Sequence, residues 1–384
     1  MNSEIEQFAS GPSPLAGAVR RWFRGSTLNG VEVPLSDLVN ELERQATTKK
    51  DYVVDTRNMG MNIRDDEPFL AFASPEGDEM EFGIRPIAHG QIADKCGIPK
   101  RYYDRMQEDA PMLLGTNVNH WLPQKEARMV RTLDGNVRAV LSDRFRTLDN
   151  ADLFFAAAST FKEVGAQIVR ADLSEGRFYM RAINPHFEAP IKHGDTLVGG
   201  VTVSNSEVGH GTMKVEQFGL RVACMNGMIG ESVFKKIHLG ERMEVGIYQA
   251  DTIQATVEAI WKQTRDHIIN AFDQHHVVDW ADTLAGTMKV DLPTATKLAT
   301  GSWKGLDVSM EEKDDILSHL LQDGEGHTQF GFIQAVTASA RDVGDADRRA
   351  ELERLGFTLT HQSEEAFERT MTQAVTVPSR RATA

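Results

Sequence analysis

Residues 127–150 read ARMVRTLDGNVRAVLSDRFRTLDN, and this stretch decides the fold that the sequence predicts. Apolar and polar residues alternate on both sides of Asp134-Gly135, a dipeptide that suits the tight turn of a β-hairpin. Asp149 or Asn150 then stands at the N-cap of a helix-like run that Gly165 ends. The stretch therefore predicts a β-hairpin followed directly by a helix.

Similar elements follow toward the C-terminus. Residues 166–183 form a second pair of alternating runs around Ser174-Glu175-Gly176, and residues 195–207 and 211–228 are also strand-like. Residues 249–274 predict the longest helix, because apolar side chains recur there every three or four positions. We therefore expect an α+β fold, with a central antiparallel sheet built of hairpins, helices packed on one face, and a mainly helical C-terminal region.

A smaller group of helices and strands is predicted before this centre. Ser36 is the expected N-cap of a helix with one apolar stripe, formed by Leu35, Leu38, Val39 and Leu42. Strand-like runs follow at residues 51–59, 67–74 and 80–87.

Residues 89–109 predict two short helices joined by Gly97-Ile98-Pro99. The spacing suits a plain αα-hairpin. It also suits a helix-turn-helix with residues 99–106 as the recognition helix, and the sequence leaves both interpretations open.

These elements predict five parts of the chain. Glycines and prolines near the N-terminus and the polar C-terminal residues indicate loosely held ends. The expected parts are a loosely ordered segment at 1–30, an α/β region with the αα-hairpin at 31–118, a central α+β domain at 119–280, a helical region at 281–372 and a disordered tail at 373–384.

The composition is that of an ordinary globular protein. The chain has 384 residues, a formal net charge of −14 and two cysteines, Cys96 and Cys224, too few for a disulfide framework. No apolar run reaches the roughly 20 residues that span a bilayer, and no signal peptide is recognisable. We therefore expect a cytoplasmic protein without membrane contact. Phosphate-binding glycine motifs are absent from the sequence, so a nucleotide-hydrolysing enzyme is not expected, and neither is a cofactor.

Positive charge collects in one part of this acidic chain. Residues 119–150 carry a net charge of +2, which leaves −16 on the remainder. Arg138, Arg144 and Arg146 are separated by even numbers of residues, so an undistorted strand would place them on one face. Guanidinium groups suit bidentate contacts to phosphates. The predicted nucleic-acid-binding residues are Arg128, Arg131, Arg138, Arg144, Arg146, Lys214 and Arg221.

Aromatic residues near these arginines would stack on unpaired bases. The residues concerned are Phe145, Phe178, Tyr179 and Phe218. The alternative is a solvated sheet face without a ligand, in which the arginines pair with neighbouring Asp143 or Asp149.

Two further patterns would carry enzyme chemistry. A metal site is one hypothesis for the side chains His186, His193, Asp195, Glu207 and His210, which fall within 25 residues. Solvent-facing loop histidines are the alternative. Cys224 would be a reactive thiolate if a helix began after Asn226-Gly227, and otherwise a buried cysteine in a strand.

Several separated motifs resemble those of the phage- and plasmid-encoded protein family that carries the domain of unknown function 932. The likeness spans residues 50–290 and includes the Gly97-Ile98-Pro99 turn. Met225 stands where that family more often has Ser. The positions that match the family's motifs are Ser142, Asp143, Arg144, Phe145, Arg146, Leu148, Asp149, Asn150, Asn205, Ser206, Glu207, Gly209, Leu220, Arg221, Cys224, Asn226 and Gly227.

The resemblance implies a bacterial host cell but brings no settled activity. In its alternation of hairpins and helices the chain is also similar to phage single-strand annealing proteins, which form rings or filaments and hold one DNA strand in a basic groove; this likeness is one of architecture. We therefore expect a non-enzymatic, homo-oligomeric single-stranded DNA-binding protein of recombination or replication. The alternatives are a metal-dependent phosphodiester hydrolase and a phage factor that engages a host defence component.

Overall fold

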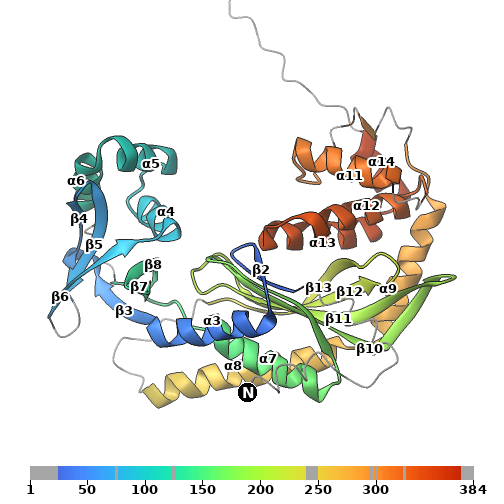
Figure 1. The fold of residues 1–384 in the computed structure, drawn as a ribbon, viewed down its shortest axis with the longest axis horizontal. Coiled ribbons are helices and arrows are strands. Elements are labelled where there is room, and N and C mark those ends of the chain that lie inside the picture. Colours follow the sequence, from blue (N-terminus) through green and yellow to red (C-terminus); the bar gives the residue numbers. More distant parts are fainter. Residues whose placement is uncertain are drawn as a thin grey trace, which may run out of the picture.

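The chain folds into two lobes that lie side by side (Figure 1). The computed structural model describes residues 25–372 apart from 74–76, 123–126, 239–249, 294–297, 300, 302, 304 and 323–325. The smaller lobe is built on a six-stranded sheet and the larger lobe on a seven-stranded sheet. Within the described residues, no helix has the length and apolar character needed to cross a bilayer.

The smaller lobe has the strand order β3-β7-β8-β6-β5-β4. Its strands are β3 (Lys50–Asp55), β4 (Met59–Arg64), β5 (Glu67–Ala73), β6 (Glu79–Ile84), β7 (Ala127–Leu133) and β8 (Asn136–Ser142). Helices α4 (Pro86–Lys95), α5 (Lys100–Asp109) and α6 (Pro111–Trp121) cover one face. The two short helices predicted within residues 89–109 are confirmed as α4 and α5, whereas α6 was not predicted.

The β-hairpin predicted around Asp134-Gly135 is confirmed. Strands β7 and β8 pair antiparallel, and the turn between them has positive φ at Asp134 (53°) and Gly135 (73°). Positive φ at both central residues is the geometry that matches the twist of a two-residue hairpin. However, the hairpin belongs to the smaller lobe. The single central sheet that the sequence predicted is therefore wrong, because the hairpins divide between two sheets.

The larger lobe has the strand order β13-β12-β11-β10-β9-β1-β2. Its strands are β1 (Ser26–Leu28), β2 (Val31–Val33), β9 (Gln167–Leu173), β10 (Phe178–Lys192), β11 (Asp195–Asn205), β12 (Met213–Arg221) and β13 (Asn226–Lys236). All neighbours pair antiparallel except β1 and β9, which are parallel.

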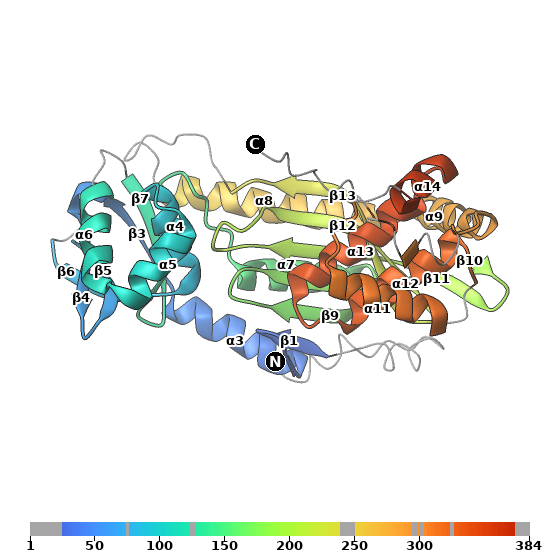
Figure 2. The same ribbon diagram turned by 90° about the horizontal axis from the view of Figure 1, so that it is seen from above.

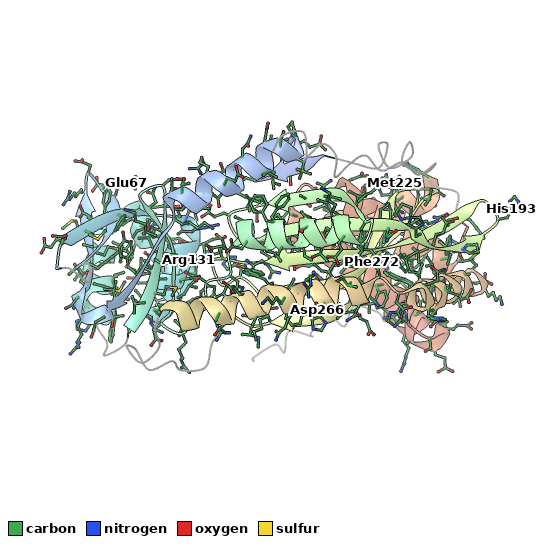
Figure 3. The ribbon with its side chains drawn as sticks, turned by 90° about the horizontal axis from the view of Figure 1, so that it is seen from below. Glu67, Arg131, His193, Met225, Asp266 and Phe272 are labelled. Atoms are coloured by element: carbon green, nitrogen blue, oxygen red, sulfur yellow. The ribbon has the colours of Figure 1, made fainter. Side chains whose placement is uncertain are left out.

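Helices cover both faces of this sheet, not one as predicted. On one face lie α3 (Leu35–Thr48), α7 (Asn150–Glu163) and α8 (Ala250–Ala271), which Figure 3 shows from below. On the other face lie α12 (Gln329–Asp342) and α13 (Ala346–Thr360), seen from above in Figure 2. The remaining C-terminal helices are α9 (Gln274–Gly286), α11 (Met310–Gln322) and α14 (Glu364–Thr372). Most residues of β10 and β11 are buried on both faces, which is why both sides need a cover.

Local signals located the helices well. In α3 the predicted apolar stripe is buried, although the N-cap is Pro34 and not Ser36. Helix α7 begins at Asn150 after Asp149, and Gly165 follows it with φ of 72°. The expected parts 1–30 and 373–384 lie mostly or wholly outside the described residues.

Candidate functional site

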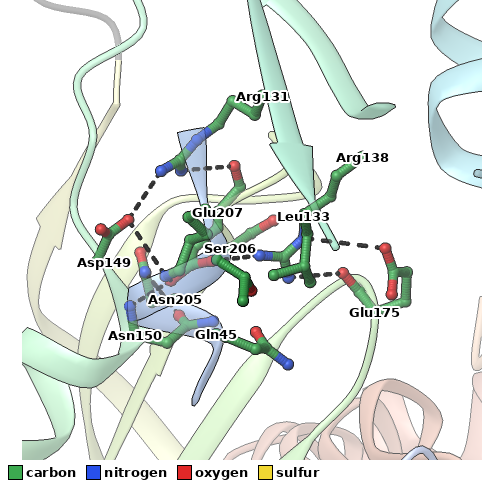
Figure 4. Close-up of polar contacts among 12 residues, drawn as sticks. Gln45, Arg131, Leu133, Arg138, Asp149, Asn150, Glu175, Asn205, Ser206 and Glu207 are labelled. Atoms are coloured by element: carbon green, nitrogen blue, oxygen red, sulfur yellow. Dashed lines mark hydrogen bonds and ion pairs between the residues drawn. The ribbon is translucent and has the colours of Figure 1, made fainter. Parts of the chain in front are cut away.

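Some of the residues singled out in the sequence, among them Arg131, Arg138 and Glu207, meet at a buried ionic cluster between the two lobes (Figure 4). Its centre is Glu207, which follows β11 and is 1% exposed. One carboxylate oxygen accepts from Lys49 Nζ at 2.6 Å and from the backbone N–H of Asn150 at 2.6 Å. The other oxygen accepts from Arg138 Nη1 at 2.5 Å. Glu207 therefore joins the first residue of α7 to the β7–β8 hairpin.

Arg131 makes the second set of contacts. It donates to Asp51 at 2.8 and 3.1 Å, to Asp149 at 2.8 Å and to the carbonyl of Glu207 at 3.0 Å. We call this group the Glu207 cluster; its side chains are Lys49, Asp51, Arg85, Arg131, Arg138, Asp149, Glu175 and Glu207. Four basic and four acidic groups balance one another, so the cluster has no surplus charge for a phosphate.

Glu207 stays ionised well below the ordinary range of a glutamate. Burial raises the pKa of Glu207, but the neighbouring positive charges, Arg138 first, outweigh burial and hold that pKa at about 2. Three of the basic groups come from the smaller lobe, and Glu207 and Glu175 come from the larger lobe. We therefore interpret the Glu207 cluster as the ionic joint between the lobes.

The expectation that the predicted arginines form one cationic surface is wrong. Arg131 and Arg138 are each 2% exposed and Arg221 is 1% exposed. Arg221 pairs with Asp195 at 2.6 Å, at the other end of the large sheet from the hairpin, and Lys214 lies 3.6 Å from Glu216. The physical reason is that a cation enters a protein interior only with compensating carboxylates or other acceptors.

Arg138, Arg144 and Arg146 were expected on one face of a continuous strand, but β8 is too short to carry all three. The strand stops at Ser142, so Arg144 and Arg146 do not continue its faces. Arg144 is exposed, while Arg128 and Arg146 are half-buried. The hydroxyl of Ser142 contacts Asp143 at 3.2 Å and accepts from the Arg144 N–H at 3.3 Å, which forms a local turn.

The proposed base-stacking aromatics are also interior residues. Phe145 is 7% exposed, and its ring stacks on His238 with centroids 4.7 Å apart. Phe178, Tyr179 and Phe218 are no more than 3% exposed. None of the four presents a ring face to a nucleic-acid base.

The family-motif residues divide between two places. Asn205 donates to the carbonyl of Leu148 at 2.7 Å and to Asn150 Oδ1 at 2.8 Å, and Ser206 donates to Gly176 O at 2.8 Å. These residues, with Asp149 and Glu207, therefore surround the ionic joint. Cys224, Asn226 and Gly227 lie instead at the β12–β13 turn beneath α12.

The histidines and acids of the metal hypothesis do not converge. His193 lies in the β10–β11 turn at the far end of the larger lobe (Figure 3), whereas Glu207 lies in the joint between the lobes. Asp195 is paired with Arg221. No three His, Cys, Asp or Glu side chains in the described part of the chain could hold a metal ion.

Cys224 lies neither ahead of a helix nor within a strand, the two environments predicted from the sequence. Strand β13 begins at Asn226, so no helix follows the cysteine, and Cys224 itself lies in the turn before that strand. Its Sγ lies 3.5 Å from Arg221 Nη1 and 3.7 Å from Gln334 Oε1.

A pocket lined by arginines was missed by the sequence reasoning. It lies between the large sheet and the α12–α13 pair and offers about 50 Å³ of space to a bound molecule. Arg170 and Arg181 reach it from β9 and β10, and Arg341 and Arg349 from α12 and α13. We call it the arginine pocket; its other lining residues are Val169, Phe218, Leu220, Met225, Gly227, Thr337 and Glu353.

Asp172 organises the charged end of this pocket. Its two oxygens accept from Arg170 at 2.9 Å, from Arg181 at 3.0 Å and from Arg349 at 3.2 Å. Arg181 also donates to Glu353 at 2.6 Å. Burial raises the pKa of Asp172, but the surrounding guanidinium charges outweigh burial and the pKa is lowered. One carboxylate therefore serves three cations.

Two guanidinium nitrogens in the pocket lack an acceptor. Arg181 is 2% exposed and Arg349 is 4% exposed, yet the Nε of each has no hydrogen-bond partner among the described residues. Burial is the largest influence on the pKa of Arg349 and lowers it, and two neighbouring guanidinium groups lower it further against the opposing effect of Asp172. Two buried donors among the arginines that line this pocket are therefore unsatisfied by the described residues.

One sequence signal could have found this site. Arg170 and Arg181 interrupt runs of residues that are otherwise buried, and an arginine in a buried strand needs an acceptor. The helical partners could not be assigned from sequence, because Arg181 and Arg349 are far apart along the chain. Comparisons of this chain with known protein families, with curated proteins and with solved structures found no match.

Proposed function

We propose that this protein is a binding protein whose ligand is a small anion held in the arginine pocket. The observation that carries the proposal is the pair of buried Nε donors, on Arg181 and Arg349, without an acceptor among the described residues. A buried donor without a partner costs about 1–3 kcal/mol, which a bound oxyanion would recover.

The charge of the pocket supports the same proposal. Four arginines line it, whereas the acidic groups that contact Arg170, Arg181 and Arg349 are Asp172 and Glu353. Arg341 also lines the pocket; it donates to the carbonyl of Cys224 and pairs with Asp342, both at 3.2 Å. Arginine forks bind carboxylate and phosphate groups in bidentate geometry. An oxyanion is therefore the ligand chemistry that this pocket recognises.

Adjacent arginines on α13 offer a matched test. Arg349 lines the pocket, whereas Arg348 points to Glu312 and Glu351 and does not line it. We expect millimolar phosphate to raise the melting temperature of the parent protein and of Arg348→Gln, but not of Arg349→Gln. Calorimetric titration with phosphate should give the same ranking. Equal phosphate effects on all three proteins would contradict the proposal.

Single-stranded DNA binding is a second candidate function. It would use a different set of basic residues from the one predicted from the sequence. Lys95 of α4 and Arg128 of β7 lie close enough that the Arg128 charge adds to burial in lowering the pKa of Lys95. Arg128 pairs in register with Ser142, and the exposed Arg144 follows two residues later. We call Lys95, Arg128 and Arg144 the basic edge. Basic groups that lie close together attract phosphates in a salt-dependent manner.

A charge-reversal experiment tests the basic edge. Arg128→Glu with Arg144→Glu should weaken the binding of a fluorescent single-stranded oligonucleotide by at least tenfold and reduce the salt slope by about 2. Arg265→Glu with Lys262→Glu, on the exposed side of α8, makes the same change in net charge elsewhere. If both double variants bind the oligonucleotide equally, or the parent does not bind it, this candidate is wrong.

The family resemblance remains a proposal. It supports a phage or plasmid origin, a bacterial host cytoplasm and a role beside nucleic acid or a host protein partner. Homo-oligomer formation belongs to the same proposal, and native mass measurement with and without an oligonucleotide tests it. Metal-dependent hydrolysis is not proposed, because its expected ligands lie apart in the structure.

A further inference from the structure

We infer that the anion in the arginine pocket is a compact inorganic oxyanion that serves as a structural ion and joins helix α13 to the large sheet. This inference rests on the proposed function, since it names the class of anion and its role at the same pocket. Two observations carry it: the small space in the pocket, and the placement of its cations on both sides of the boundary between sheet and helix.

The space in the pocket suits a compact ion. About 50 Å³ is open to a bound molecule. One water molecule needs roughly 10–15 Å³, so the pocket has room for a few water-sized groups. A tetrahedral oxyanion such as phosphate or sulfate consists of a few oxygen atoms around one centre and matches this size. A ring or a chain attached to it would find no further space inside.

Close packing defines both sides of the pocket. Gly227 lines it on the sheet side, where a Cβ would come within 2.8 Å of the Phe218 ring. On the helix side, a Cβ on Gly356 of α13 would come within 2.5 Å of Cγ2 of Thr337, which lines the pocket from α12. The two glycines therefore allow closer contacts than a side chain would permit, and the small space is a consequence of that packing.

The cations of the pocket come from both layers. Helices α12 and α13 lie across one face of the large sheet (Figure 2). Arg170 of β9 and Arg181 of β10 are paired in register on the sheet, and Arg349 of α13 shares Asp172 with both. Burial lowers the pKa of Arg349, and the charges of Arg170 and Arg181 lower it further against the opposing effect of Asp172. Like charges therefore face one another across the boundary between sheet and helix.

The carboxylates at this boundary leave one positive charge unbalanced. Three cations meet there, those of Arg170, Arg181 and Arg349. Among the described residues, the carboxylates that contact them are Asp172 and Glu353. One unsatisfied Nε belongs to Arg181 on the sheet and the other to Arg349 on α13. An oxyanion that accepts from both would balance the remaining charge and connect the two layers.

Helix α13 also has an anchor away from the pocket. Arg354 does not line the pocket, and it donates to Glu216 of β12 at 2.7 and 3.0 Å. The helix therefore does not depend on the anion alone. We expect the anion to slow the local opening of α13 without being required for folding.

Hydrogen exchange of the backbone amides tests the inference. Phosphate or sulfate at about ten times its dissociation constant should slow exchange in α13 about tenfold, because the opened helix has lost the ion. Strands β4 and β5 of the smaller lobe are the internal control and should be unaffected, and potassium chloride of equal ionic strength controls for screening. Arg349→Gln should abolish the slowing, whereas Arg348→Gln, at a position that does not line the pocket, should retain it.

The outcomes separate this inference from the proposed function. If phosphate or sulfate binds in calorimetry but slows α13 no more than β4 and β5, or if chloride slows α13 equally, the structural role is overturned and the proposed function stands. Phenyl phosphate, whose ring has no space in the pocket, should bind no more tightly than inorganic phosphate, and tighter binding would overturn the compact ion. If neither phosphate nor sulfate binds, the proposed function falls as well.

Discussion

Two buried arginines in this protein show how differently a guanidinium group can be satisfied. Arg131 contacts two carboxylates and a backbone carbonyl, all within 3.1 Å. Arg349 shares Asp172 with two other arginines, and its Nε has no acceptor among the described residues. The first arrangement stabilises the fold without need of a ligand. The second leaves a donor and a charge that a ligand can satisfy.

At the same scale, Glu207 is the residue whose loss should matter most for stability. Glu207→Gln leaves Lys49 and Arg138 buried without their carboxylate, and the loss of one partner of a buried pair typically costs about 3–5 kcal/mol. We expect the free energy of unfolding in urea to fall by that amount. Glu231→Gln, at an exposed position on β13, is the matched control and should change it by less than about 0.5 kcal/mol. Equal stability of the two variants would contradict the role of the Glu207 cluster.

At the scale of elements, helices and hairpins follow from local patterns. Helix α7 begins after Asp149 and ends before Gly165, as the capping residues predicted. However, the Asp149 side chain makes no capping bond, since it pairs with Arg131, and the N–H of Asn150 is bound instead by Glu207. The start of the helix could be predicted from sequence. The residue that binds its first N–H could not, because Glu207 follows β11 and lies 57 positions away from Asn150.

Strand β13 shows the opposite case. Residues after Asn226 could be interpreted as a helix start, yet they form an eleven-residue strand beside β12. Gly227 lies opposite Leu220 in that pairing and against the Phe218 ring. Strand β13 could form there only because the backbone groups along one edge of β12 were otherwise unpaired. No local sequence pattern predicts where such an edge lies.

At the scale of the whole molecule, the ionic joint between the lobes makes stability depend on acid. The pKa of Glu207 is about 2 in the folded protein, below its ordinary value of 4.5. A carboxylate with a lowered folded pKa contributes stability that is present above about pH 4.5 and is lost as the pH falls toward 2.

We therefore expect the urea midpoint of the parent protein to fall steeply between pH 5 and about pH 2.5. The full shift corresponds to about 3 kcal/mol from Glu207 alone. Glu207→Gln should show a smaller decline over the same range, because its amide does not titrate. Parallel pH profiles for the two proteins would show that Glu207 is not the group responsible.

The arrangement of the lobes decided which sequence expectations failed. The β7–β8 hairpin enters the smaller lobe and presents Arg131 and Arg138 to the larger one, so residues expected on a surface lie in an interior. Helices α12 and α13 cover the face of the large sheet that was expected to be open, and the arginine pocket forms beneath them. The first outcome depends on contacts of Arg131 and Arg138 with Glu207, 76 and 69 positions away, and the second on contacts between residues more than one hundred positions apart.

The amino-acid sequence by itself determined most of the helices, the hairpins and their turns, because periodicity, caps and turn residues act over a few neighbouring positions. Only the tertiary structure decided which arginines found carboxylates and which kept unused donors. The physical reason is that burial and ion pairing depend on the distance between side chains in space, and distant segments set that distance when they pack together.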